Sequence, residues 1–133
     1  MAQAMAAIAR ARSGDAARAR ELVEAARRTV LGFDWSAREW NEWADAEVCE
    51  AEGHPERSQA LFERALAIIP PAFQYDATEV RLALARFLIR QRRPAEARGL
   101  LEAARDFYQD PAAFRLRAET ERLLRQCEQV LAS

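Results

Sequence analysis

Apolar and small residues recur along this chain with the spacing of amphipathic helices. In one segment, Ala19, Leu22, Val23 and Ala26 follow the three-and-four spacing that places side chains on one helical face. Short segments that contain Gly or Pro interrupt this pattern at regular intervals. The pattern predicts an all-α protein of about seven helices, of which the first spans residues 2–12, the third 37–51 and the last 111–132.

Capping residues mark where several of these helices begin. Asp15 is a good N-cap for the second helix, and Pro55 and Pro94 suit the first positions of the fourth and sixth, where a missing N–H is tolerated. Residues 36–39 (SARE) and 76–79 (DATE) have the spacing of a capping box. They predict that the third helix starts after Ser36 and the fifth after Asp76.

The helical pattern repeats every 39 residues without a gap. Residues 14–31, 53–70 and 92–109 align throughout and carry the same residue types at several places. The matching residues are Leu22, Leu61 and Leu100, then Glu24, Glu63 and Glu102, and finally Ala26, Ala65 and Ala104. A repeat of this size is typical of stacked helical hairpins, and the last helix would then be a cap that covers the end of the stack.

The second copy resembles the tetratricopeptide repeat, a family of paired helices. It has Gly53, Ser58, Phe62, Ala65 and Pro70 at that family's spacing. The small residues let two helices approach closely, and Phe62 fills the gap that they leave. The resemblance implies one domain, a right-handed α-solenoid of three hairpins over residues 1–35, 36–74 and 75–110, with a capping helix over 111–132.

The period of 39 residues is longer than the 34 of this family. The five extra residues fall at the junctions between hairpins, around residues 32–35 and 71–75. Five aromatic residues lie in these junctions and at the equivalent place before the last helix, and we expect them to pack each linker onto the stack: Phe33, Trp35, Phe73, Tyr75 and Phe114.

Two further resemblances leave the functional class open. Trp40 and Trp43 with Glu47, followed by residues 61–66, are similar to the half-a-TPR variant of RNA-processing proteins, although the other two copies lack the Trp residues. The tail after Pro94 is similar to tetratricopeptide regions of large bacterial regulators. A module in RNA processing and a homodimerising regulatory domain therefore remain alternatives.

Composition and charge limit the choice of partner. The net charge is −1, so the chain has no overall positive potential for nucleic acid, and nucleic acid is not the expected partner. No stretch approaches 18 apolar residues, which predicts no membrane span and a cytoplasmic protein. Cys49 and Cys127 lie 78 residues apart, twice the repeat, and are predicted to be buried apolar residues.

The sequence lacks the usual members of a catalytic site. His54 is the single histidine, and the four Gly residues form no phosphate-binding loop. Two cysteines without CxxC spacing indicate no metal site. We therefore expect no enzyme activity, no metal and no cofactor.

Charge is distributed unevenly along the chain. Residues 34–56 contain eight acidic residues and one Arg, whereas residues 81–98 contain six Arg and one Glu. In tetratricopeptide stacks the first helix of each hairpin lines a concave groove, which would here alternate in sign. By this resemblance the groove residues are Trp40, Trp43, Glu47, Glu50, Leu82, Arg86, Ile89, Arg90, Glu121 and Arg125.

Two interpretations of these residues are open. In the functional one, the groove binds a peptide or protein segment, with Trp40 and Trp43 as apolar anchors and the charged residues setting its orientation. In the structural one, Glu47 and Glu50 pair with Arg86 and Arg90 of the neighbouring first helix, and the two Trp residues are half-buried residues of the stack. Independently of both, the Ala-rich first helix would be a surface for homodimerisation.

Overall fold

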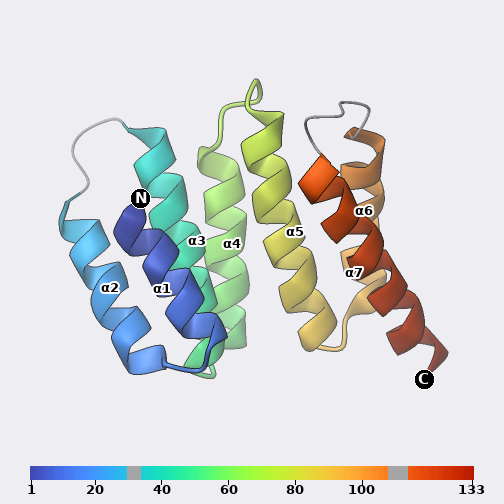
Figure 1. Ribbon diagram of the computed structural model, residues 1–133, viewed down its shortest axis with the longest axis horizontal. Coiled ribbons are helices and arrows are strands. Elements are labelled where there is room, and N and C mark those ends of the chain that lie inside the picture. Colours follow the sequence, from blue (N-terminus) through green and yellow to red (C-terminus); the bar gives the residue numbers. More distant parts are fainter. Residues whose placement is uncertain (30–33, 108–113) are drawn as a thin grey trace. The chain divides into compact units, whose positions relative to one another are not determined.

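The predicted helices are present in the computed structural model, which describes residues 1–29, 34–107 and 114–133. The described residues form seven α-helices and no strand, which confirms the all-α prediction (Figure 1). The helices are α1 (Ala2–Arg12), α2 (Ala16–Arg28), α3 (Trp35–Ala51), α4 (Pro55–Ile68), α5 (Gln74–Arg90), α6 (Pro94–Phe107) and α7 (Phe114–Ala132).

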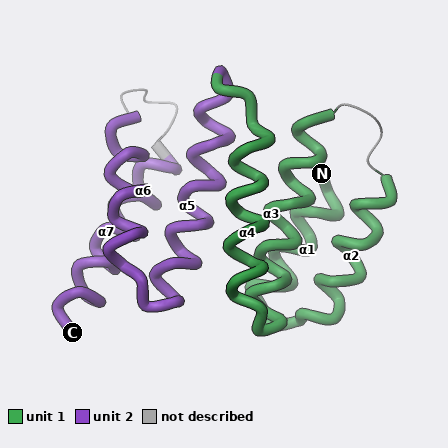
Figure 2. The backbone as a smooth tube through the Cα atoms, turned by 180° about the vertical axis from the view of Figure 1, so that it is seen from behind, with its two compact units in different colours: residues 1–71 green, residues 72–133 purple. Residues whose placement is uncertain are grey.

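The helices form two compact units, residues 1–71 and residues 72–133 (Figure 2). In unit 1, α1 pairs with α2, α3 packs on both of them, and α4 pairs with α3. In unit 2, α5 pairs with α6, and α7 contacts both. Each unit thus joins helices that are neighbours in sequence, as stacked hairpins require. The division falls between Pro71 and Ala72, in the predicted junction after the second hairpin.

Small residues are buried where paired helices approach each other. Ser58 of α4 illustrates the contact, because its hydroxyl donates to the backbone carbonyl of Ala46 in α3 at 2.7 Å. Several positions 39 residues apart are buried in all three copies, as the predicted register requires. The buried sets are Ala7, Ala46 and Ala85 in the first helices, and Ala26, Ala65 and Ala104, with Val23, Phe62 and Leu101, in the second helices.

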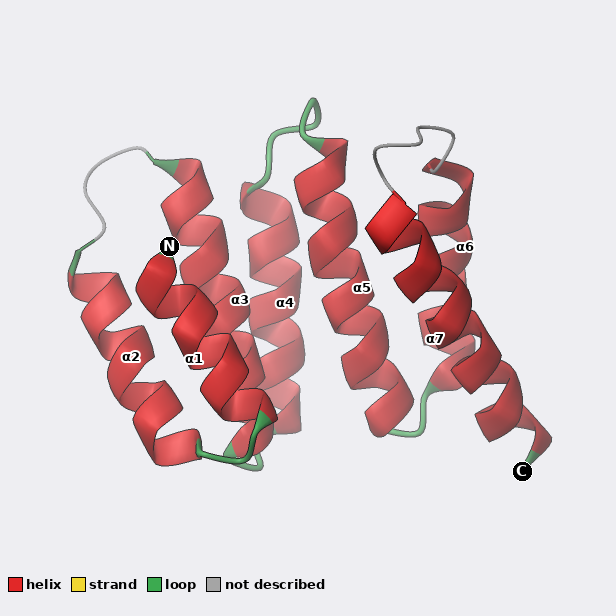
Figure 3. Ribbon diagram, viewed as in Figure 1, coloured by secondary structure: helices red, strands yellow, loops and turns green. Residues whose placement is uncertain are grey.

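The turn inside each hairpin has the same backbone geometry in all three copies (Figure 3). Gly14, Gly53 and Arg92 occupy the left-handed region, with φ of 90°, 85° and 62°. The following residue then donates its N–H to a carbonyl five residues earlier: Asp15 to Arg10 at 2.9 Å, His54 to Cys49 at 2.8 Å and Arg93 to Leu88 at 2.8 Å. These are Schellman-type helix ends, for which glycine is the favoured residue. The third copy adopts the same turn with an arginine.

The starts of α3 and α5 differ from the predicted capping boxes. The carboxylate of Asp34 accepts the N–H groups of Ser36 at 3.0 Å and Ala37 at 3.2 Å, so Asp34 is the N-cap and Ser36 lies inside the helix. α5 begins at Gln74, and Asp76 lies in its first turn without capping it. Both predictions were wrong because each helix starts before the expected cap.

Some large apolar side chains are exposed. Met5 of α1 is 51% exposed, and the linker residues Phe73 and Tyr75 are 45% and 41% exposed. Trp35, the third linker aromatic, is half-buried. The prediction that these aromatics plug the junctions is therefore wrong for Phe73 and Tyr75. Phe33 and the side chain of Phe114 lie outside the described residues.

The close approach of α3 and α4 can be tested by enlarging Ala65, which has no exposed surface. Ala65→Leu is expected to lower the free energy of unfolding by about 1–3 kcal/mol, because the added carbons have no space between the helices. Urea unfolding followed by Trp fluorescence measures this change, since all three Trp residues lie on α3. Ala60→Leu, at an exposed position of the same helix, is the matched control and should change the stability by less than about 0.5 kcal/mol. Equal effects of the two variants would contradict the helix contact.

The strained turn at Arg92 gives a second test. Arg92→Gly is expected to raise the free energy of unfolding by about 1 kcal/mol, because glycine adopts the left-handed conformation without a Cβ clash. Arg92→Ala separates the backbone from the charge, since alanine removes the guanidinium and keeps the strain. Thermal unfolding followed by circular dichroism should show a higher Tm for the glycine variant alone. A gain in both variants would trace the effect to charge.

Candidate functional site

α3 is almost entirely buried although it carries much of the negative charge of the chain. Glu39, Glu42, Asp45 and Glu47 are only 2%, 6%, 3% and 3% exposed. A buried carboxylate is costly unless cations or hydrogen-bond donors surround it. The acidic run of the sequence therefore packs largely inside the protein, and its partners determine what the helix can do.

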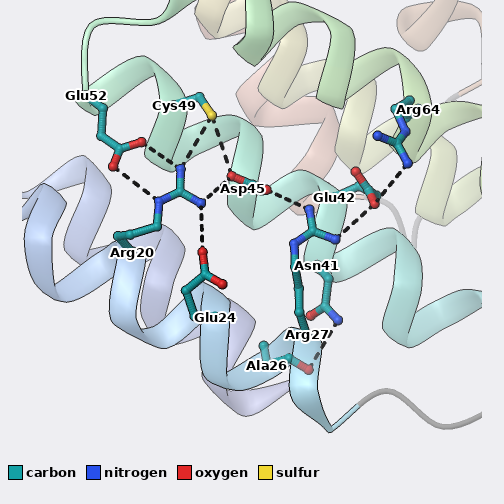
Figure 4. A network of polar contacts seen from close by, with 10 residues as sticks. All are labelled: Arg20, Glu24, Ala26, Arg27, Asn41, Glu42, Asp45, Cys49, Glu52 and Arg64. Carbon is teal, nitrogen blue, oxygen red and sulfur yellow. Dashed lines mark hydrogen bonds and ion pairs between the residues drawn. The ribbon is translucent and has the colours of Figure 1, made fainter.

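Asp45 lies between two arginines of α2 (Figure 4). Its two oxygens accept from Arg20 Nη1 at 2.8 Å and from Arg27 Nη2 at 2.6 Å. Arg20 also reaches both oxygens of Glu52, at 2.6 and 3.2 Å, and Arg27 donates to Glu42 at 3.2 Å. Two arginines thus connect three carboxylates of the α3 segment and fix α2 against it.

The same network extends to the other helices of unit 1. Arg12, the last residue of α1, donates to Glu47 at 2.6 Å. Arg64 of α4 lies 3.7 Å from Glu42. Asn41 adds a neutral contact by donating to the carbonyl of Ala26 in α2 at 3.4 Å. Residues of α1, α2 and α4 therefore neutralise α3 from three sides.

These contacts set the protonation of the network. Burial would raise the pKa of the Asp45 carboxyl, but the hydrogen bonds from Arg27 and Arg20 outweigh it and hold this pKa below its ordinary value. The hydrogen bond from Arg20 likewise lowers the pKa of Glu52. The sulfur of Cys49 lies 3.5 Å from both Asp45 and Arg20, and burial followed by the Asp45 charge raises the thiol pKa. Asp45 and Glu52 are therefore charged near neutral pH and Cys49 is a thiol.

Both cysteines are buried and free, as predicted. Cys49 is 1% exposed and Cys127 is completely buried. Burial also raises the pKa of the Cys127 thiol. Each therefore serves as a small packing residue in its helix.

Trp40 and Trp43 stack on each other along α3. Their ring centroids are 4.7 Å apart and their planes differ by 17°. Trp43 is 7% exposed, whereas Trp40 is half-buried. The indole Nε1 of Trp43 is buried and has no hydrogen-bond partner among the described residues. Of the two predicted anchors, Trp40 is thus the one that a partner can reach, and Trp43 supports it.

The predicted site residues of unit 2 also divide into buried and exposed groups. Leu82 and Ile89 are 4% and 9% exposed, so they belong to the packing of α5. Arg86 is half-buried, and its Nε lies 4.0 Å from Glu119 of α7. Arg90 of α5 and Arg125 of α7 are exposed. The accessible predicted residues of this unit are therefore mainly arginines.

The remaining predicted residues have clear positions within their own units. Glu50 is half-buried at the end of α3, and Glu47 is held by Arg12 as described above. Glu121 of α7 is bound by Arg105 of α6 through two contacts of 3.0 Å. The predicted site residues thus lie on α3, α5 and α7. Of these residues, Arg90 and Arg125 are exposed and Trp40 is half-buried.

Comparison with known protein families identifies the repeat. Residues 50–120, more than half of the chain, match a family described as tetratricopeptide repeat. The chain belongs to the tetratricopeptide repeat family. Searches of curated proteins and of solved structures found no match. The resemblance carried by Gly53, Ser58, Phe62, Ala65 and Pro70 is confirmed, since all five lie within the matched residues.

The arginines that neutralise α3 in this tetratricopeptide repeat protein were missed in the sequence. Arg20 and Arg27 are seven residues apart, two helical turns, and so lie on one face of α2. Glu42, Asp45, Cys49 and Glu52 follow three-and-four spacing on one face of α3. The arginine stripe on α2 and the acidic stripe on α3 are the sequence signal from which this network could be predicted.

The described part of this tetratricopeptide repeat protein offers no other chemical centre. No group of three or more His, Cys, Asp or Glu residues there is placed to hold a metal ion. A surface depression of about 470 Å³ at the turn between α3 and α4 is lined by Gly53, His54, Pro55, Glu56 and Arg57. None of the described helices has the length and apolarity that a bilayer crossing requires.

The network predicts a specific dependence of stability on pH. The folded-state pKa of Asp45 is lowered, so its contribution is fully present above its unfolded pKa of about 3.9 and is lost as the pH falls through the folded value. Asp45→Asn is expected to lower the free energy of unfolding at pH 7 by about 2 kcal/mol, because two hydrogen bonds to charged arginines are weakened. The loss stays moderate because Arg20 keeps its hydrogen bond to Glu52 and Arg27 keeps its hydrogen bond to Glu42.

Urea unfolding, followed by Trp fluorescence between pH 3 and 7, measures both the loss of stability at pH 7 and its dependence on pH. The wild type should lose more stability on acidification than Asp45→Asn, so the difference between them should shrink at the acid end. Ala60→Leu, an exposed substitution on α4 that changes no titratable group, is the control and should leave the pH dependence unchanged. Parallel pH profiles of wild type and Asp45→Asn would show that Asp45 does not contribute as described.

Proposed function

We propose that this tetratricopeptide repeat protein is a non-catalytic interaction module that binds a peptide or protein segment through the first helices of its hairpins. The family supports this role, because its repeats generally mediate protein binding. The observation that carries the proposal is the Trp pair of α3. A half-buried Trp40, stacked on a buried Trp43, is a rigid apolar surface of the kind that forms hot spots at interfaces.

The predicted site residues take different roles in this proposal. Trp40 contacts the partner, and Trp43 holds its ring in place by stacking. Within unit 2, Leu82 and Ile89 are buried and position α5, while Arg90 and Arg125 are exposed and are the predicted residues that a partner of this unit can reach. The half-buried residues Glu50 and Arg86 and the buried Glu47 orient these contacts. Association with a second copy through α1 is compatible with this role, since α1 contributes none of the proposed site residues.

An RNA-related function is the alternative that the half-a-TPR resemblance suggested. It rests on Trp40 and Trp43, which lie outside the residues matched to the tetratricopeptide repeat family. RNA bound through arginine contacts to phosphate would lose affinity steeply as the salt concentration rises. A peptide anchored on Trp40 would depend much less on salt. Titration at two salt concentrations therefore distinguishes the two ligands.

The proposal predicts that Trp40 dominates partner affinity. Peptides selected from a displayed random library against the whole chain provide the ligand, and fluorescence anisotropy of a labelled peptide gives its Kd. Trp40→Ala is expected to raise this Kd by about 10-fold or more, the effect of removing an interface hot spot. The variant should keep the helical circular dichroism of the wild type, because Trp40 is only half-buried.

Trp35→Ala is the matched control, since Trp35 is also a half-buried Trp of α3 and is not a proposed site residue. Its Kd should stay within about 2-fold of wild type, because residues away from a hot spot contribute little.

Arg125→Glu should weaken binding of an acidic peptide, whereas Arg117→Glu, also exposed on α7, should not. Unchanged affinity in Trp40→Ala would remove the anchor from the proposal.

A further inference from the structure

Arg92 occupies a turn position at which the other two hairpins have glycine. Gly14 and Gly53 have φ of 90° and 85° there, and Arg92 adopts the same left-handed conformation with φ of 62°. A Cβ strains this conformation, and strained residues cluster at functional sites, where the side chain has a use that offsets the strain. The exposed guanidinium group of Arg92 forms no hydrogen bond or ion pair with another described residue. No polar contact inside the protein therefore explains an arginine here.

The turn at Arg92 belongs to a strongly basic segment of unit 2. Residues 90–98 contain four Arg and one Glu. That one carboxylate is already occupied, because Nε and Nη2 of Arg93 contact the two oxygens of Glu96 at 2.5 and 2.7 Å. The end of α5 and the start of α6 therefore carry positive charge that no carboxylate of this segment neutralises.

α7 brings a further arginine to the same end of unit 2 (Figure 1). α6 and α7 run antiparallel, and two contacts of 3.0 Å between Arg105 and Glu121 fix their alignment. From that pair toward the turn between α5 and α6, Arg125 follows one helical turn along α7, and Arg98 lies two turns back along α6. Burial raises the pKa of the Cys127 thiol and the charge of Arg98 opposes this shift, so Arg98 lies near this part of α7. Both arginines thus lie at the end of unit 2 that contains the α5–α6 turn.

Three arginines at this end differ from most other arginines of unit 2. Five arginines pair with a carboxylate of the same unit: Arg86, Arg93, Arg105, Arg115 and Arg122. The guanidinium groups of Arg92, Arg98 and Arg125 form neither a hydrogen bond nor an ion pair with any residue that the structure describes. Glu128, exposed near the end of α7, balances one of these three charges. We call Arg92, Arg98 and Arg125 the basic end of unit 2.

We propose that the basic end of unit 2 binds carboxylate side chains of an acidic segment in a protein partner. This contact rests on the proposed function, the binding of a protein segment, and specifies the chemistry of that segment. A guanidinium group presents a planar set of donors that matches a carboxylate, and complementary charge speeds the encounter of the two proteins. A segment with several carboxylates can meet more than one of the three arginines. Glycine at position 92 would relieve the strain and lose one of these contacts.

Nucleic acid is a poorer match for this surface than an acidic protein segment. The net charge of the chain is −1, so the arginines of the basic end are not part of an overall positive potential. Three arginines also neutralise few phosphates, and affinity for nucleic acid depends on their number. The family supports a protein ligand, because its repeats generally mediate protein binding.

Arg92→Gly tests the proposal, because stability and binding should change in opposite directions. The variant is expected to be more stable than the wild type, since glycine adopts the turn without strain. It should nevertheless bind a short labelled glutamate-rich peptide about 3- to 10-fold more weakly in fluorescence anisotropy at low salt, because one charged hydrogen-bonding group is lost. A role in the fold alone would not weaken binding. The same peptide with glutamine in place of every glutamate should not bind the wild type.

Arg117→Gln is the matched control, since it removes the same charge from an exposed position in the first half of α7. Its Kd for the glutamate-rich peptide should stay within about 2-fold of wild type, whereas Arg125→Gln should weaken binding about as much as Arg92→Gly. Circular dichroism checks that all three variants remain helical. Backbone amide signals that shift when the peptide is added should lie in residues 90–98 and in the second half of α7.

Three results would each overturn the proposal. They are an unchanged Kd in Arg92→Gly, an equal loss of affinity in Arg117→Gln, and tighter binding of a single-stranded RNA that carries the same charge as the peptide. The outcome is separable from that of the proposed Trp40 anchor. If Trp40→Ala leaves the library-selected peptides unaffected while Arg92→Gly weakens the glutamate-rich peptide, the anchor is wrong and the basic end stands. The reverse result removes the basic end and keeps the anchor.

Discussion

Close approach of paired helices at small residues is the constraint on which each unit depends. Ala7, Ala46, Ala65 and Ala85 have no exposed surface, and a larger side chain at any of them would push two helices apart. The two helices of a hairpin must therefore meet at matching heights, which requires a turn of fixed geometry. The left-handed residue and its five-residue hydrogen bond supply that turn at Gly14, Gly53 and Arg92. The constraint is strong enough that the third copy keeps the turn although an arginine must adopt the strained conformation.

Within unit 1, charged residues specify how the second hairpin packs on the first. Shape alone would allow α3 to slide along α2, because alanine-rich faces fit in several registers. The pairs from Arg20 and Arg27 to Glu42, Asp45 and Glu52 permit one register, since a shift by one turn would leave carboxylates buried without partners. This network also explains why α3 tolerates so many buried charges.

The sequence predicted the fold because its signals are local. The prolines at 55 and 94 and the buried alanines depend only on spacing along one helix or one turn, and the 39-residue register repeats these local signals along the chain. The capping box at residues 36–39 failed for a related reason, because Asp34, a competing cap close by, satisfies the first N–H groups of α3 before Ser36 can. The candidate site was less predictable. Acidic residues are usually exposed, and the burial of Glu42 and Asp45 depends on arginines 15 to 25 residues away on another helix. The same long-range pairing places Glu47 against Arg12.

Pairing inside the fold changes which charges a partner can meet. Residues 1–71 contain nine Arg and twelve acidic residues, but four of those carboxylates are buried on α3, so the accessible acidity of unit 1 is lower than its sequence suggests. Residues 72–133 contain eleven Arg and nine acidic residues, and Arg90, Arg117 and Arg125 are exposed. A guanidinium group offers a planar pair of donors to a carboxylate, which an exposed arginine can make with a partner as Arg20 makes it with Glu52. The exposed arginines of unit 2 are therefore groups that carboxylates can bind.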